Sequence, residues 1–357
     1  MVGLVFINEI GVCPYIDKYI DELEKNGQEY EIIIWDRYYY KGKTYNRDNL
    51  IAFGMPANEK ENVIMKLLHF YRYSKFLKKT IARKKYDKLI ILSTLSGMVC
   101  YKELKTKYKG KYIFDYRDAS YERLGLFYKL LTNIIDNSAF TCISSDGFRR
   151  ILPNREYVLA HNFRYADLEK QVDAVMLNRS NPIKVSYIGL LREFSYHKRL
   201  IDIFGNDSRF VLRFHGDGPE INKIREYASE FNNVEITGRY NNDEKNKYNL
   251  DADMLLYNYP CSYNRNCALA NKYYDGILYK KPMIANVDTF SGQLVKEKGL
   301  GVSLSFALTN DEYKNQVYDY YLGFDQEEFV KNANEELERI LQEDKLYVEK
   351  IDGFILE

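Results

Sequence analysis

A lysine and an aspartate three residues apart are the residues of this sequence best suited to binding a charged ligand. They are Lys272 and Asp275, within a stretch, 271–286, in which apolar side chains recur at helical spacing and then form a short run after a proline. Both fall in the first turn of the predicted helix, on one face of it. A cation at that place suits a phosphate, and a carboxylate suits the hydroxyl groups of a ribose.

The elements around this pair predict where the ligand binds. Residues 254–257 form a buried apolar run, so the local unit is strand, loop, helix and strand. In such units ligands gather at the carboxyl ends of the strands, beside helix N-termini that expose free amide donors.

Two further predicted strands, 183–188 and 210–214, lead into turns that contain glycine. Gly189 directly follows the first strand, and Gly216 and Gly218 follow the second, before Pro219. Glycines permit a close approach of the backbone, and proline suits the first turn of a helix. No G-x-G-x-x-G follows the first strand of either half of the chain, which argues against a dinucleotide-dependent dehydrogenase.

Strands and helices alternate in two series, which predicts an α/β fold. At 357 residues the chain exceeds what one core usually supports. We expect two Rossmann-like domains with parallel sheets, facing each other across a cleft: an N-terminal domain over 1–165 and a C-terminal domain over 180–325. Polar residues separate them, and an acidic amphipathic helix over 326–357 is expected to cross back to the first domain.

Composition and targeting signals favour the cytoplasm. The five cysteines are scattered, without a C-x-x-C pair, as in a reduced compartment. The chain starts in a strand rather than in a basic leader, and it has no run of about 18 apolar residues.

Positive charge is concentrated in one region. The net charge is +1, yet residues 60–111 hold fifteen Lys or Arg against three acidic residues. A basic, aromatic-rich helix over 65–79 suits an anionic membrane surface, with contact through 65–88, and it equally suits a core-packed helix with a solvated basic face. No nucleic-acid recognition motif accompanies the patch, so nucleic acid is not an expected partner.

Metal and cofactor sites are not expected. Asp251 and Asp253 form a D-x-D pair, but they stand at the amino end of a predicted strand, whereas ligands gather at carboxyl ends. The four histidines lack metal-ligand spacing.

The run ALANKYYDGILYKKPMIAN resembles the donor-nucleotide motif of GT-B glycosyltransferases, specifically the family-4-like group of bacterial capsular and exopolysaccharide enzymes. The resemblance implies that Lys272, with Asn271 beside it, contacts the donor phosphate and that Asp275 binds the ribose. Cys267 stands where many relatives carry a second glutamate. Either that contact is lost, or this chain belongs to a branch that uses the Asn-Lys pair instead.

The same resemblance extends to the strand-end turns. It implies that Gly189, Gly216 and Gly218 approach the donor diphosphate, that Arg192 or Lys198 supplies a cation to it, and that the turn at Gly238 borders the nucleobase.

In the first half of the chain, the segment Asp115-Tyr116-Arg117-Asp118 resembles a D-x-R-D segment of the same enzymes. The resemblance implies that Asp118 faces the acceptor or the donor sugar. A purely structural pair of Asp115 with Arg117 is the alternative.

The resemblance implies a retaining glycosyltransferase that moves a sugar from a nucleotide-sugar donor to a glycan or lipid-linked acceptor in surface polysaccharide biosynthesis. Such an enzyme would be cytoplasmic, peripheral at the inner membrane face. A non-catalytic scaffold of a polysaccharide assembly complex and a sugar-nucleotide epimerase are the alternatives. Failure to bind any nucleotide would favour the scaffold, and action on the donor without an acceptor would favour the epimerase.

Overall fold

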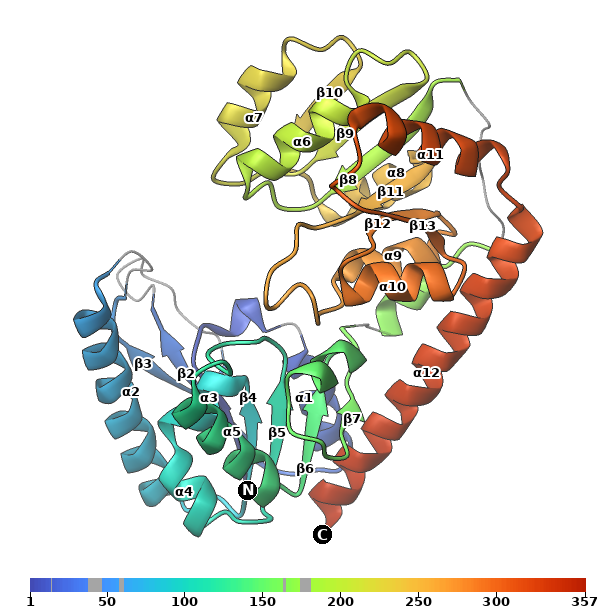
Figure 1. Cartoon of the computed structure of the whole chain (residues 1–357). Helices are drawn as coiled ribbons and strands as arrows, with labels where there is room; N and C mark the ends of the chain where they lie inside the picture. Colours follow the sequence, from blue (N-terminus) through green and yellow to red (C-terminus); the bar gives the residue numbers. More distant parts are fainter. Residues whose placement is uncertain (14, 38–46, 58–60, 163–164, 174–180) are drawn as a thin grey trace. The chain divides into compact units, whose positions relative to one another are not determined.

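The chain divides into two compact units (Figure 1). The structure, a computed structural model, describes residues 1–13, 15–37, 47–57, 61–162, 165–173 and 181–357. The N-terminal unit comprises Met1–His161 and Gln342–Glu357, and the C-terminal unit comprises Asn162–Leu341. The polar segment predicted to separate two domains lies partly outside the described residues.

The N-terminal unit is built on a parallel sheet of seven strands among the described residues, in the order β3-β2-β1-β4-β5-β6-β7. The strands are β1 (Val2–Phe6), β2 (Tyr30–Asp36), β3 (Leu50–Gly54), β4 (Lys88–Leu92), β5 (Tyr112–Tyr116), β6 (Phe140–Ile143) and β7 (Val158–Leu159). The helices are α1 (Ile16–Lys25), α2 (Val63–Lys84), α3 (Thr94–Val99), α4 (Tyr101–Thr106) and α5 (Gly125–Asn137).

Continuous apolar runs place the central strands of this sheet. All five residues of β1 are buried, as expected for a parallel strand that is covered on both faces. Alternate side chains of β1, namely Val2, Leu4 and Phe6, pack in one core cluster with α1 and with the end of the chain. On the other face, Gly97 of α3 lies against Phe114 of β5.

The C-terminal unit repeats this architecture with six parallel strands among the described residues, in the order β10-β9-β8-β11-β12-β13. They are β8 (Ile183–Ile188), β9 (Phe210–His215), β10 (Val234–Gly238), β11 (Met254–Tyr257), β12 (Met283–Asn286) and β13 (Gly301–Leu304). The helices between and after them are α6 (Phe194–Phe204), α7 (Ile221–Ala228), α8 (Asn242–Asp251), α9 (Asn271–Leu278), α10 (Phe290–Glu297) and α11 (Asn310–Leu322). The predicted fold class of two Rossmann-like parallel sheets is therefore confirmed.

The last helix, α12 (Gln326–Leu356), contributes to both units. Its first half buries Phe329, Ala333 and Leu337 in the C-terminal unit, on the face that the sequence pattern predicts. Its final turns belong to the N-terminal unit, where Tyr347 meets Tyr19 of α1 edge-to-face at 5.7 Å. None of the helices in the described part of the chain has the length and apolar composition needed to cross a membrane.

Candidate functional site

The C-terminal unit contains a topological switch point. From β8 the chain proceeds to β9 and β10 on one side, and then returns to place β11, β12 and β13 on the other side. The helices that follow β8 and β11 therefore leave in opposite directions, and a crevice opens at the carboxyl ends of these strands. This is where an open parallel sheet binds its ligand.

Two glycine turns meet beside this switch point, at the ends of β8 and β9. The Gly189 N–H donates to the His215 carbonyl oxygen at 2.8 Å, and the Leu191 N–H donates to the Asp217 carbonyl oxygen at 2.9 Å. A Cβ on Gly216, whose φ is +156°, would lie only 1.8 Å from the carbonyl oxygen of Gly189. Only glycine permits this approach of two backbones.

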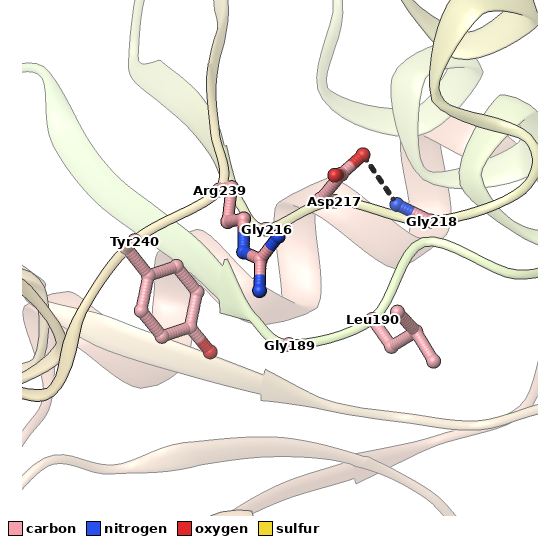
Figure 2. Close-up of a pocket in the computed structure, with 7 residues that line it drawn as sticks. All are labelled: Gly189, Leu190, Gly216, Asp217, Gly218, Arg239 and Tyr240. Atoms are coloured by element: carbon pink, nitrogen blue, oxygen red, sulfur yellow. Dashed lines mark hydrogen bonds between the residues drawn. The ribbon is translucent and has the colours of Figure 1, made fainter. Parts of the chain in front are cut away.

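The turns form one wall of a pocket of about 460 Å³. Figure 2 shows the Arg239 guanidinium and the Tyr240 ring reaching into it from the turn after β10. The Gly218 N–H donates a hydrogen bond to the Asp217 carboxylate at 2.7 Å. The lining residues are Gly189, Leu190, Gly216, Asp217, Gly218, Arg239 and Tyr240. The pocket thus combines glycine backbone, the apolar Leu190, one aromatic ring, one exposed cation and the Asp217 carboxylate.

Lys272 of α9 approaches the same turns from the other side of the switch point. Its Nζ lies 3.6 Å from the centre of the Tyr187 ring and donates to the Tyr259 hydroxyl at 2.7 Å. It also lies 3.3 Å from the position that a Cβ on Gly189 would take. Burial lowers the pKa of Lys272, but Tyr187 and Tyr259 favour the charged form, and the net pKa is raised. A buried ammonium is therefore held beside the glycine turns.

Asp275, the second residue of the pair, is also buried. It accepts a hydrogen bond from Lys245 of α8 at 2.9 Å. Burial raises the pKa of Asp275, while Lys245 and Lys272 oppose that rise. Lys272 lies in the first turn of α9, as predicted, but the prediction was wrong for Asp275, which lies in the second turn because the helix begins at Asn271. The charges of both are compensated by neighbours that the sequence analysis did not single out.

The other residues predicted for the donor lie at differing places. Asn271 is exposed at the start of α9, and Gly238 ends β10 with a φ of +88°. Arg192 is exposed after the Gly189 turn and does not line the pocket. Lys198 points elsewhere, since on α6 it pairs with Asp202 at 2.8 Å and donates to Tyr227. The donor contacts of these residues stay predictions.

Polar groups near the base of the sheet and at the strand ends have structural partners. Asp253 accepts from the Lys184 backbone N–H at 2.8 Å, and Asp251 pairs with the Lys184 and Arg213 side chains. His215 stacks on Tyr248 with ring centres 3.8 Å apart. Within the described ranges, no group of three or more His, Cys, Asp or Glu side chains is arranged to hold a metal ion.

In the N-terminal unit, Asp115 and Arg117 form a buried, two-pronged ion pair at the end of β5. The Arg117 Nε and Nη2 donate to the Asp115 carboxylate at 2.6 and 2.9 Å, and the Tyr19 hydroxyl donates to it at 2.8 Å. The structural pair that the sequence left as an alternative is therefore present. Asp118 follows it and is exposed, and its role stays a prediction.

Sequence reasoning missed the side chains that surround Lys272. Tyr187 stands two residues before the Gly189 turn, and Tyr259 stands two residues after β11. Both therefore belong to the carboxyl ends of the two strands that flank the switch point, which is a detectable signal. Lys245 lies near the start of α8, and no local pattern connects it with Asp275.

The fold is similar to those of solved glycosyltransferase structures, whereas no protein-family model and no curated protein matches the sequence. Sucrose-phosphate synthase from Thermosynechococcus elongatus aligns over 99% of this chain and 99% of its own, with a TM-score of 0.67 and 15% identity. A glycosyltransferase from Rickettsia africae aligns over 100% and 98%, with a TM-score of 0.65 and 16% identity. HepE from Anabaena, solved with UDP, aligns over 99% of both chains, with a TM-score of 0.66 and 10% identity. These likenesses span both units and agree with the expected GT-B fold.

Proposed function

We propose that this protein is a glycosyltransferase that moves a sugar from a nucleotide-sugar donor to a glycan acceptor. The chief support is Lys272, whose buried ammonium lies at the switch point beside the Gly189 turn. A cation beside a glycine turn suits a diphosphate, because the turn has no side chain that would keep the charged phosphates away from the backbone. The likeness in fold to glycosyltransferases, among them HepE with bound UDP, agrees with this assignment.

The donor would be held by charge and by close backbone contact. An ammonium has three N–H groups. In Lys272 one donates to the Tyr259 hydroxyl and one faces the Tyr187 ring, so the third can donate to a phosphate oxygen. Arg192 would add a second positive charge as the diphosphate leaves, so that the charge is balanced without a metal. Asp275 would accept hydrogen bonds from the ribose hydroxyls, and the turn at Gly238 would border the base.

In the transfer step, the bond from the anomeric carbon to the diphosphate breaks and an acceptor hydroxyl oxygen bonds to that carbon. Asp118 would orient this hydroxyl or take its proton. We propose retention of configuration and a lipid-linked acceptor in surface polysaccharide synthesis. Contact of residues 65–88 with an anionic membrane would suit such an acceptor.

A nucleotide series tests the donor site. The unfolding temperature of the wild type is measured with UDP, GDP, CDP and dTDP, and then for Lys272→Met, which keeps the length of the side chain but removes its charge. One nucleotide at about a hundred times its dissociation constant should add roughly 2.7 kcal/mol to the free energy of unfolding. Lys296→Met, at an exposed position of α10, is the matched control and should respond as the wild type does.

The outcomes separate the alternatives. Stabilisation by one nucleotide that Lys272→Met abolishes, with release of that nucleotide from its sugar only when a glycan acceptor is added, supports the proposal. No stabilisation by any nucleotide favours the non-catalytic scaffold. Conversion of the donor sugar without an acceptor favours the epimerase.

A further inference from the structure

An ion pair joins the two loops that flank the switch point of the C-terminal unit. Arg265 lies in the loop between β11 and α9, and its Nη2 donates to Oε1 of Glu193, which directly precedes α6. Strands β8 and β11 are neighbours in the sheet, so both loops leave from the same carboxyl edge. The pair therefore lies on the ligand side of the sheet, and the proposed function gives it no role.

Arg265 lies close to the cation that is proposed to hold the donor phosphate. The Arg265 Cζ is 5.6 Å from the centre of the Tyr259 ring, and the Lys272 Nζ is 4.8 Å from the same centre. The two charges are therefore no more than about 10 Å apart. A phosphate on Lys272 and the sugar bonded to that phosphate span a distance of this order. A group on the far side of the sugar can thus reach the Arg265 guanidinium.

The loop that carries Arg265, residues 258–270, is held in place on both sides of this residue. The Ser262 hydroxyl accepts from the Arg265 backbone N–H at 3.2 Å, and the Ser262 N–H donates to the Asn266 side chain at 3.0 Å. The Phe290 N–H, at the start of α10, donates to the Asn266 carbonyl oxygen at 3.2 Å. The backbone of Arg265 is therefore ordered before a ligand arrives, and the ligand does not have to order it.

The guanidinium of Arg265 can exchange its partner. The side chain of Arg265 is 32% exposed and that of Glu193 is 41% exposed. Ion pairs of this exposure contribute little to stability, because water screens both charges, so a ligand carboxylate can replace that of Glu193 at low cost. The planar N–H groups of a guanidinium match the two oxygens of a carboxylate. A neutral hydroxyl in the same place would leave the charge of Arg265 uncompensated.

We propose that Arg265 selects the sugar of the donor and that this sugar carries a carboxylate, as a hexuronic acid does. The sugar carboxylate takes the place of Glu193 on the guanidinium, while Lys272 holds the diphosphate at the other end of the sugar. A neutral hexose lacks this contact and leaves the pair of Arg265 with Glu193 closed. The inference rests on the proposed function, because it starts from a diphosphate on Lys272, and it names the class of sugar that the proposed function leaves open.

Titration calorimetry with matched sugar nucleotides tests the proposal. The two ligands share the base that stabilises the wild type and differ only in the acid group of the hexose: UDP-glucose and UDP-glucuronate, GDP-mannose and GDP-mannuronate, CDP-glucose and CDP-glucuronate, or dTDP-glucose and dTDP-glucuronate. We expect the wild type to bind the acidic ligand at least about tenfold more tightly, because its carboxylate forms charged hydrogen bonds. Arg265→Gln should lose this preference and bind the nucleoside diphosphate alone as the wild type does. Glu193→Gln removes the competing carboxylate and should bind the acidic ligand more tightly than the wild type does.

A control and two contrary results complete the test. Arg209→Gln removes an arginine of similar exposure, 30%, that pairs with Asp207 before the amino end of β9, and it should keep the preference of the wild type. Equal or tighter binding of the neutral ligand by the wild type would overturn the proposal. So would an equal loss of the nucleoside diphosphate alone in Arg265→Gln, because the guanidinium would then hold phosphate rather than the sugar. Absence of all nucleotide binding by the wild type would instead overturn the donor site itself, and this inference with it.

Discussion

Replacing Gly216 with alanine should disrupt the pocket at the ends of β8 and β9, and the structure sets the size of the effect. The new Cβ would lie 1.8 Å from the Gly189 carbonyl oxygen and 2.9 Å from its carbonyl carbon. An ordinary contact is about 3.4 Å or longer, so one of the two turns must move by about 1.5 Å. That movement strains the hydrogen bonds from Gly189 to His215 and from Leu191 to Asp217, which hold the turns together.

The expected loss is about 1–3 kcal/mol in the free energy of unfolding, the range for overpacking, which lowers the unfolding temperature by about 2–12 °C for a unit of this size. Nucleotide-dependent stabilisation should disappear as well, because the displaced turn lines the pocket. Calorimetry with and without the nucleotide identified for the wild type measures both quantities.

Gly353→Ala is the matched control for this variant. A Cβ on Gly353 meets nothing within 4 Å, and the residue lies within α12. This change should raise the free energy of unfolding by about 0.5–1 kcal/mol, as alanine does in a helix, and leave nucleotide binding unchanged. Wild-type stability and nucleotide affinity in Gly216→Ala would refute the argument that the two turns must touch.

Three further predictions concern the neighbours of the pocket. Tyr259→Phe removes the 2.7 Å hydrogen bond from the Lys272 ammonium, which is worth about 1.5–3 kcal/mol. Nucleotide affinity, measured by titration calorimetry, should fall roughly tenfold. Unchanged affinity would show that this hydrogen bond does not position the lysine. Lys245→Met removes the cation that opposes the rise in pKa of Asp275. The pH below which nucleotide affinity falls should therefore be higher in the variant than in the wild type, and identical pH profiles of the two would contradict this. Burial lowers the pKa of His215 to about 4, so on acidification this histidine takes up a proton in the unfolded protein before it does so in the folded protein. The stability it contributes is complete above about pH 6.5 and is lost as pH falls toward 4, by about 3 kcal/mol at most, and His215→Asn should show a shallower pH dependence of the free energy of unfolding.

Three strands that were not predicted from the sequence, β3, β7 and β13, lie at the edges of the two sheets. β3 and β7 end the order of the first sheet, and β13 ends that of the second. The residues of β3 are intermediate or exposed, and those of β13 are half-buried except for Leu304. An edge strand is covered less completely than a central one, and its sequence signal is often weaker. β7 has only two residues, and β13 alternates Val302 and Leu304 with glycine and serine, whereas β1 is a continuous apolar run. β3 does carry an apolar run over 50–53, which was a detectable signal.

The sequence by itself determined the class of fold and the placing of two charged side chains on one helix. Apolar runs alternating with helical periods specify parallel sheets, and helix spacing puts Lys272 and Asp275 on one face, because both are properties of neighbouring residues. Glycines at the strand ends likewise indicated where two stretches of backbone approach each other closely.

Only the tertiary structure decided which groups surround that pair. Lys272 is surrounded by Tyr259 and Tyr187, which lie 13 and 85 residues before it in the chain, and Asp275 binds Lys245, which lies 30 residues before it. These residues meet because parallel strands bring their carboxyl ends to one edge of the sheet. The order of the strands sets those contacts, and no local pattern encodes it. The same holds for α2: its helical period was visible in the sequence, but which side of the helix is buried depends on where Trp35 and Phe6 lie in the folded sheet.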